Sequence, residues 1–188
     1  MVINYLGGGS LKLQSGPISL LVNPESNRFK ADITLKTLTP ADFVGNLEPG
    51  EVSFPGEYEI KEVEILGIQV AEESAEKFLK TVYLVKWEDI KIAFLGHISK
   101  FPSAAVIEKL DEPDVVILPV GGGHFLEPDL AAKLVRQLEP SYVVPTFYKD
   151  PKDFLKAIGQ KGETEERLVF KKKDLAGAKN KVVILKSA

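Results

Sequence analysis

Residues 114–148, DVVILPVGGGHFLEPDLAAKLVRQLEPSYVVPTFY, decide the fold. They combine an apolar strand, a glycine turn that carries one of only two histidines, an amphipathic helix and a second strand. In open α/β sheets, ligands and catalytic groups collect in the loops at the carboxyl ends of strands. The stretch therefore predicts a β-α-β unit whose strand ends face one cleft.

The helix of this unit has clear signals at its start and along one face. Pro128 suits the first helical turn, and the flanking acidic residues Glu127 and Asp129 favour the positive end of the helix dipole. The apolar stripe that would pack on the sheet is Leu130, Ala131, Leu134, Val135 and Leu138.

The rest of the chain adds mostly antiparallel strands before this unit and shorter elements after it. Strands are predicted at residues 2–6, 11–14, 18–22, 31–37, 81–85, 90–95, 167–170 and 181–185, with half-exposed antiparallel strands over 58–65. Short helices are predicted at 103–110 and from Asp150 to Gly159. Strands first and β-α-β units later favour an α+β (αββα) fold, with two mixed sheets packed face to face and flanked by helices, over a doubly wound sheet.

Length and charge limit the possible classes of protein. A chain of 188 residues fits a single domain, taken as residues 1–188. Its 24 basic and 27 acidic residues give 24 − 27 = −3, and neither sign forms a block, so no nucleic-acid partner is expected. With no cysteine, disulfides and thiolate metal sites are excluded.

The apolar runs are short, and this bears on location. The run at residues 115–120 is far below the ~20 residues of a membrane-spanning helix, and the first ten residues lack a basic region followed by an apolar core. We expect no membrane partner and a cytoplasmic protein. A homo-oligomer is compatible with these features, and the physiological partner is left open.

Seven motifs along the chain together resemble a known superfamily. They are YLGGGSLKLQ (5–14), LVNP (21–24), ADITLKTLTPADFVGN (31–46), PGEYEI (55–60), IAFLGH (92–97), LPVGGG (118–123) and VVPTFY (143–148). In order and spacing they are similar to the metallo-β-lactamase-fold superfamily, and within it to compact hydrolases like ascorbate-6-phosphate lactonase. The resemblance covers almost the whole chain and implies the fold stated above.

The resemblance also shows where metal ligands would be expected. The superfamily's THxHxDH loop matches residues 37–43, where the three histidines are replaced and the aspartate is kept, as Asp42. The position of the bridging aspartate holds His97. The histidine positions of the family fall on Gly8, Leu38, Pro40, Phe43 and Phe147.

These replacements remove the lone pairs that a dinuclear metal centre needs. Leu38, Pro40, Phe43 and Phe147 carry only hydrocarbon side chains. We expect them to meet and fill the metal pocket, leaving no metal and no other cofactor. The leading hypothesis is a pseudoenzyme that has lost its hydrolase activity and acts as a non-catalytic binding or scaffold domain.

The alternative hypothesis is an active hydrolase with a rebuilt site. His97 is expected beside Asp42, which would orient its ring as a general base, and His124 follows the glycine turn of the same cleft. Such a site would act on a small phosphorylated or lactone-like substrate. Zn, Mn or Fe is expected only under this alternative.

A few further residues are candidates for ligand binding. The backbone amides of Gly121, Gly122 and Gly123 offer donors to an anion, although GGGH lacks the spacing of a nucleotide-binding loop. Asn23 replaces an aspartate often found at this position in the family. As an amide, it is a neutral group rather than a strong metal ligand.

Overall fold

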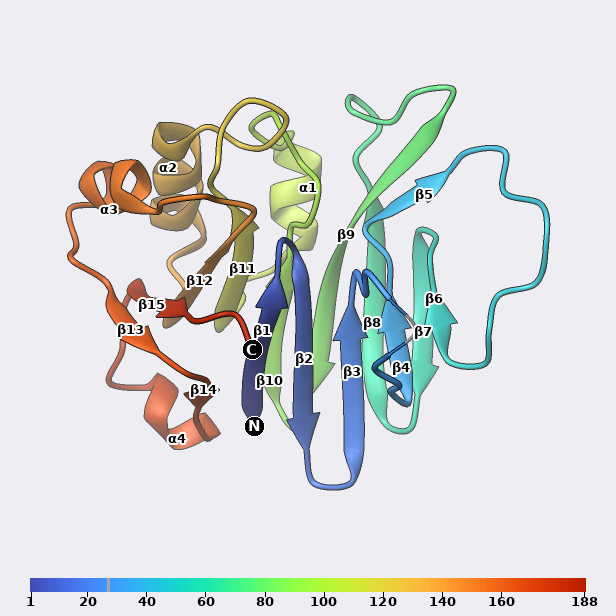
Figure 1. Ribbon diagram of the computed structural model, residues 1–188, viewed down its shortest axis with the longest axis horizontal. Helices are drawn as coiled ribbons and strands as arrows, with labels where there is room; N and C mark the ends of the chain where they lie inside the picture. Colours follow the sequence, from blue (N-terminus) through green and yellow to red (C-terminus); the bar gives the residue numbers. More distant parts are fainter. Residues whose placement is uncertain (27) are drawn as a thin grey trace.

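Two mixed β-sheets packed face to face form the body of the computed structural model, which describes residues 1–26 and 28–188 (Figure 1). The smaller sheet has six strands in the order β14-β1-β2-β3-β4-β6. These are β14 (Leu168–Val169), β1 (Val2–Gly7), β2 (Ser10–Ser15), β3 (Ile18–Val22), β4 (Ile33–Leu35) and β6 (Glu51–Val52).

The larger sheet has nine strands, and the strands of the β-α-β unit at residues 114–148 lie within it. Its strands in spatial order are β13 (Glu163–Glu165), β15 (Lys181–Leu185), β12 (Tyr142–Thr146), β11 (Val115–Pro119), β10 (Ile90–Phe94), β9 (Phe78–Trp87), β8 (Val63–Gln69) and β7 (Gly56–Ile60), with β5 (Leu38–Pro40) paired to β9. Strands β10, β11 and β12 are parallel neighbours, so their carboxyl ends lie along one edge.

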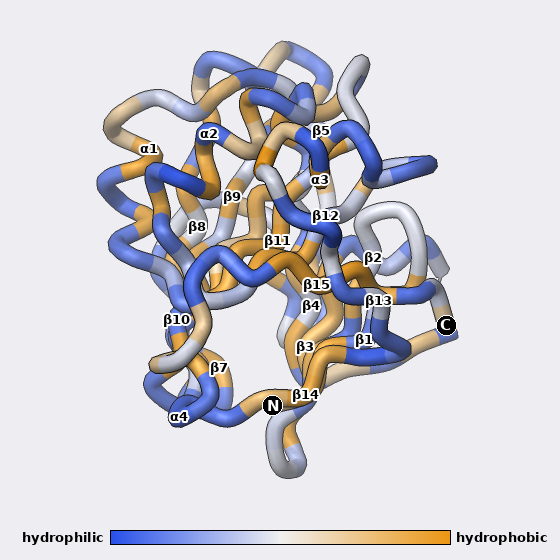
Figure 2. The backbone as a smooth tube through the Cα atoms, turned by 90° about the vertical axis from the view of Figure 1, so that its left-hand side faces the viewer, coloured by the Kyte–Doolittle hydropathy of each residue, from blue (hydrophilic) through white to orange (hydrophobic). Residues whose placement is uncertain are grey.

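The core between the sheets is built from the alternating apolar residues of both. Leu13 and Leu20 from the smaller sheet and Val85 and Ile117 from the larger one belong to a single buried cluster. Figure 2 shows hydrophobic residues following these central strands, while hydrophilic residues are common in the helices and turns. Burial of this apolar surface is the main stabilising term of the sandwich.

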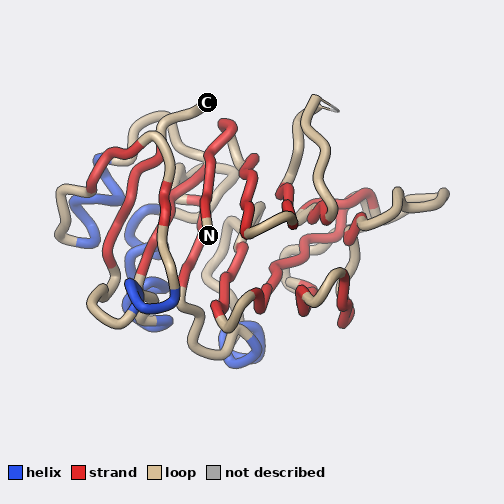
Figure 3. The backbone as a smooth tube through the Cα atoms, turned by 90° about the horizontal axis from the view of Figure 1, so that it is seen from below, coloured by secondary structure: helices blue, strands red, loops and turns tan. Residues whose placement is uncertain are grey.

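Helices cover the other face of the larger sheet. They are α1 (Ala104–Lys109), α2 (Pro128–Leu138) and α3 (Lys152–Ile158), whereas α4 (Lys172–Leu175) is a single turn near β14. Leu134, Val135 and Phe154 pack there against Val116 and Val143 in a second buried cluster. Figure 3 shows the strand layers with these helices gathered to one side. The predicted fold class is therefore confirmed.

Four short elements were not predicted. Residues 38–40 were expected to be irregular, but they form β5, because the ten-residue β9 extends past β8 and offers its free edge to them. Strand β6, strand β13 and helix α4 are the others. Among the described residues, no helix has the length and apolarity needed to cross a membrane.

Candidate functional site

The candidate site lies where β10, β11 and β12 end. His97 comes three residues after β10, Gly121 two residues after β11, and Phe147 directly after β12. From the facing sheet, Asn23 follows β3, which brings its amide to the same end of the sandwich. The predicted convergence of strand ends is therefore present.

His97 is held through its Nδ1 atom. This atom lies 2.7 Å from Oγ1 of Thr37, which is itself buried. Asn23 fixes Thr37 in turn, because its Nδ2 donates to Oγ1 at 2.9 Å and its Oδ1 accepts from the Thr37 amide at 2.9 Å. The same threonine hydroxyl can donate to Asn23 Oδ1 at 3.1 Å, and its oxygen can then accept a hydrogen bond from a protonated Nδ1 of His97.

The surroundings keep His97 neutral. Burial, followed by the positive charge of Lys80, lowers the pKa of His97 from 6.5 to about 4. The ring is half-buried rather than sealed, so it keeps contact with solvent. At neutral pH it therefore presents an uncharged imidazole whose Nε2 is the nitrogen not engaged by Thr37.

Two phenylalanines form an aromatic wall beside His97. The ring centroids of Phe125 and Phe147 lie 4.2 Å apart, and the His97 centroid lies 4.8 Å from that of Phe147. The ring of Phe147 covers Gly9 so closely that a Cβ there would lie 1.8 Å from Cζ. Only glycine fits at position 9 beneath this ring.

The backbone of Phe147 is in the left-handed region, with φ of 52°. A side chain as bulky as phenylalanine rarely adopts this conformation, which costs roughly 1–3 kcal/mol. Its amide donates to the Gly8 carbonyl at 2.9 Å, and this bond between the two sheets holds the strained residue in place. Such strain is concentrated at functional sites.

A cavity of about 680 Å³ opens on the outer side of Phe147. The glycine turn, His124, Phe125, Phe147 and Tyr148 line it. The charged residues in its lining are Lys149, Asp150 and Asp153. The cavity therefore has an aromatic wall and more negative than positive side chains.

The expected His97–Asp42 pair is not formed. Asp42 is exposed in the loop after β5, and Thr37 takes the place beside the imidazole that the sequence assigned to Asp42. His124 is also exposed, on the rim of the cavity next to Phe125. The strand β5 causes this difference, because its pairing with β9 carries the following loop outward.

The expected hydrocarbon plug is also largely absent. Pro40 and Phe43 are exposed, and the Phe43 ring packs on Phe54 at 5.9 Å instead of on Phe147. Leu38 is half-buried within β5. Of the four replaced side chains, Phe147 is the one that packs on His97, and Phe125 completes the aromatic cluster.

The glycine turn lines the cavity, but its amides are partly engaged. The Gly122 amide donates to the Leu126 carbonyl at 3.1 Å, and the Gly123 amide donates to Glu127 Oε1 at 2.9 Å. These bonds reduce the number of donors that the predicted anion site could offer. Gly121 instead lies against the Phe147 carbonyl, where a Cβ would come within 2.0 Å of the oxygen.

Sequence reasoning missed Thr37, Phe125 and Lys80. Thr37 opens the matched THxHxDH loop, so its position was visible, but its contact with His97 depends on the pairing of two sheets. Phe125 follows His124 directly, and nothing in the local sequence indicates that its ring turns toward Phe147.

A metal centre needs several side-chain ligands that lie close together. Among residues 1–26 and 28–188, no group of three or more histidine, cysteine, aspartate or glutamate side chains could hold a metal ion. His97 offers one free nitrogen, and its neighbours Thr37, Phe125 and Phe147 supply no strong ligand. The donor set does not fit a dinuclear centre.

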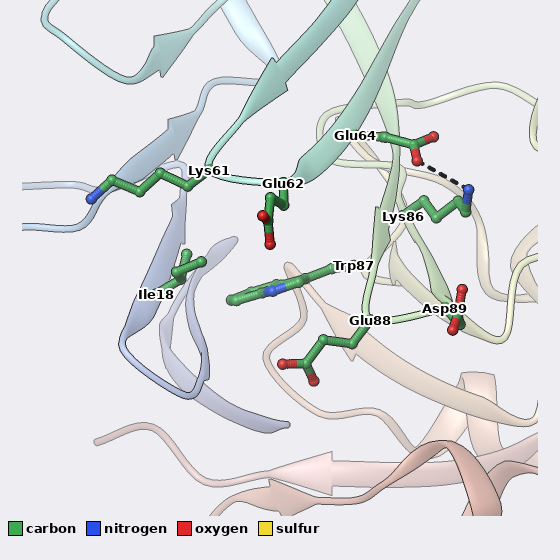
Figure 4. Close-up of a pocket in the computed structure, with 8 residues that line it drawn as sticks. All are labelled: Ile18, Lys61, Glu62, Glu64, Lys86, Trp87, Glu88 and Asp89. Atoms are coloured by element: carbon green, nitrogen blue, oxygen red, sulfur yellow. Dashed lines mark hydrogen bonds and ion pairs between the residues drawn. The ribbon is translucent and has the colours of Figure 1, made fainter.

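A second pocket lies at the opposite end of the sandwich (Figure 4). It surrounds Trp87 at the β9–β10 turn, and among its charged groups Lys86 pairs with Glu64 at 3.0 Å. Because it is formed by the turn preceding β10, it is remote from the strand ends that carry His97.

Comparison with known proteins identifies the family. The beta-lactamase superfamily domain matches residues 2–147, and the chain belongs to this family. A metal-dependent hydrolase of Thermococcus kodakarensis is 36% identical over 43% of this chain and 40% of its own length. One from Sulfurisphaera tokodaii is 31% identical over 52% of this chain and 46% of its own length. The chain thus matches less than half the length of these curated relatives.

Solved structures agree on the fold. A proposed Zn-dependent hydrolase of the metallo-β-lactamase superfamily from Thermotoga maritima has a TM-score of 0.83 at 22% identity, covering 98% of this chain and 97% of that one. A metallo hydrolase from Ignicoccus hospitalis has a TM-score of 0.69 at 16% identity, covering 100% and 95%.

These comparisons correct the leading hypothesis drawn from the sequence. That hypothesis was a pseudoenzyme acting as a binding or scaffold domain. It is contradicted because the relatives are named metal-dependent hydrolases and the structural neighbour is a proposed Zn-dependent hydrolase. The alternative hypothesis of a hydrolase agrees better with these names.

Proposed function

We propose that this protein is a hydrolase that uses His97 as a general base on a small, uncharged ester or lactone. The observation that carries the proposal is the neutral imidazole of His97, oriented by Thr37 at 2.7 Å and packed against Phe147, which lines the aromatic cavity. A positioned base of this kind contributes about 10²–10⁴-fold to a hydrolytic rate. The names of the relatives support the reaction class.

The reaction can be written with the residues present. His97 Nε2 takes a proton from a water molecule as the water oxygen attacks the carbonyl carbon of the substrate. The carbon–oxygen bond to the leaving group then breaks, and the imidazolium returns the proton to the departing alkoxide. Thr37 serves both steps in the same way, because its oxygen accepts from Nδ1–H while its own hydroxyl donates to Asn23 Oδ1.

The metal named for the relatives has no place in this scheme. The described side chains near His97 do not provide its ligands, so no step is assigned to it. Of the rebuilt site predicted from sequence, the proposed reaction retains His97. It leaves Asp42 out, because that residue is exposed, and assigns His124 to the rim where a bound ligand would pass.

The cavity favours a lactone-like over a phosphorylated substrate. Its lining has one cation, Lys149, and two carboxylates, Asp150 and Asp153, so it offers no cluster of positive charge to a phosphate dianion. The stacked rings of Phe125 and Phe147 instead provide an apolar surface for the carbon skeleton of a ligand.

Hydrolysis assays with the variant His97→Gln test the proposal. With 4-nitrophenyl acetate and δ-valerolactone we expect kcat/KM to fall about 100-fold in His97→Gln, because the general base is lost. The control His124→Gln changes the other histidine, and should stay within about threefold of wild type. Equal rates for wild type and His97→Gln, or a preference for 4-nitrophenyl phosphate, would contradict the proposal.

A further inference from the structure

A buried carboxylate binds the loop that follows His97. The side chain of Glu73 is only 2% exposed, yet it carries a charge. Its oxygens accept from Ser99 Oγ at 2.6 Å, from the Ser99 amide at 2.8 Å and from the Lys100 amide at 2.9 Å. Lys80 Nζ adds an ion pair at 2.8 Å.

This set of donors keeps Glu73 ionised. Burial acts to raise the pKa of Glu73, but the hydrogen bonds from Lys80, Ser99 and Lys100 outweigh it, and the pKa lies below its usual value. A buried charge with this many partners is costly to build and strongly disrupted by removal of one partner. No step of the proposed reaction uses it directly.

The bonds of Glu73 join the two segments that fix the imidazole. Ser99 is two residues after His97, so Glu73 anchors the loop that carries the ring. Lys80 lies opposite Leu38 in the β5–β9 pair, and the neighbouring Thr81 amide donates to the Thr37 carbonyl at 3.0 Å. Glu73 therefore connects the loop of His97 to the strand that holds its partner Thr37.

We infer that Glu73, through Lys80 and Ser99, is a positioning residue that keeps His97 in hydrogen-bonding register with Thr37. The effect of this positioning on catalysis rests on the proposed function. The positioning itself depends only on the fold. The positive charge of Lys80 helps to lower the pKa of His97. The neighbouring side chains Thr37, Phe125 and Phe147 carry no charge.

A matched control exists at the other end of the sandwich. Asp32 also accepts from a serine amide and hydroxyl, both of Ser19 at 2.9 Å, and forms an ion pair with Lys61. It lies just before β4, whereas the site follows the ends of β3 and β10. Removing Asp32 therefore breaks a similar network without touching the His97 loop.

The experiment compares Glu73→Ala, Glu73→Gln and Asp32→Ala in the whole chain. One readout is kcat and KM on 4-nitrophenyl acetate. The other is the NMR signals of the His97 ring, assigned with His124→Gln. We expect Glu73→Ala to lower kcat at least tenfold with KM within twofold, and to shift the His97 signals. Glu73→Gln, which keeps an acceptor for Ser99, should recover part of both, and Asp32→Ala should leave both at wild type.

Two results would overturn the inference. One is a folded Glu73→Ala with wild-type His97 signals or, if Glu73→Ala does not fold, a Glu73→Gln with wild-type His97 signals. The other is an equal change of those signals in Asp32→Ala. If the wild-type protein hydrolyses none of the esters, the proposed function fails, while the NMR comparison still decides whether Glu73 positions His97.

Discussion

At the scale of single residues, the neutral state of His97 is the property on which the proposed chemistry depends. A charged imidazole could not accept a proton from water. Burial and Lys80 together lower its pKa to about 4, so the base is available throughout the neutral range. This is a consequence of packing, since the sequence around position 97 contains no charged neighbour closer than Lys100.

The lowered pKa predicts a specific loss of stability in acid. Because the pKa of His97 is 6.5 in the unfolded chain and about 4 in the fold, the unfolded chain binds the proton first as pH falls. The contribution to the free energy of unfolding is fully present above pH 6.5, declines between 6.5 and about 4, and is lost below. It amounts to about 1–3 kcal/mol.

Urea unfolding at pH 7 and pH 4.5 measures this effect. The wild type should lose more stability over this interval than His97→Gln, whose side chain does not titrate. Equal losses in the two proteins would show that the protonation of His97 is not coupled to folding.

The contact between Phe147 and Gly9 gives a second prediction at this scale. Gly9→Ala places a methyl group within 1.8 Å of the Phe147 ring, and we expect a destabilisation of about 1–3 kcal/mol from overpacking. Gly177→Ala, where nothing lies within 4 Å, is the control and should be near neutral. Denaturation of Gly9→Ala in a Phe147→Ala background should show most of the cost removed, and an undiminished cost there would refute the contact.

Individual residues were the least predictable level from the sequence. His97 was found because histidine is rare in the chain and follows a glycine at a strand end. Its partner was assigned to Asp42, because the family's loop keeps an aspartate there. The actual partner Thr37 depends on the path of the chain after β4, which local sequence does not determine.

At the scale of elements, the prediction from sequence was much more successful. Alternating apolar residues and turn signals located β1, β2, β3, β15 and the helix α2 to within about two residues. The failure at β5 has a physical reason. Residues 38–40 have little strand pattern of their own and become extended because the edge of β9 is available to pair with them.

The ends of two helices provide a matched pair of predictions. Glu139 caps α2 in the left-handed conformation with φ of 48°, and Gly159 caps α3 with φ of 79°. Because only glycine adopts this region freely, Glu139→Gly should stabilise the protein by about 1 kcal/mol, and Gly159→Ala should destabilise it by a similar amount. Thermal unfolding measures both, and shifts of the same sign would contradict the explanation.

At the scale of the whole molecule, the sandwich brings together strand ends that are far apart in sequence. Asn23 and Thr37 from one part of the chain meet His97 from another, and the Phe147 amide binds the Gly8 carbonyl across the two sheets. The fold class was predictable because the order of strands and helices excludes most architectures. That residues 1–188 form a single domain stays a prediction, as do a cytoplasmic location and the oligomeric state.

The side chains of this chain and the names of its relatives lead to different expectations for the metal content of the protein. The side chains of the described residues do not form a metal-ligand group, whereas the relatives are named metal-dependent hydrolases. We expect substoichiometric metal in protein purified without chelator, measured by inductively coupled plasma mass spectrometry. Stoichiometric zinc, manganese or iron would contradict the expectation and require ligands from elsewhere.

The most direct test of the central claim is the rate of 4-nitrophenyl acetate hydrolysis by metal-stripped wild type and metal-stripped His97→Gln. If His97 is the general base, the stripped wild type keeps its full rate and the variant loses about 100-fold. A variant that retains the wild-type rate would contradict this role of His97, and so would hydrolysis that is abolished by stripping and restored by added zinc.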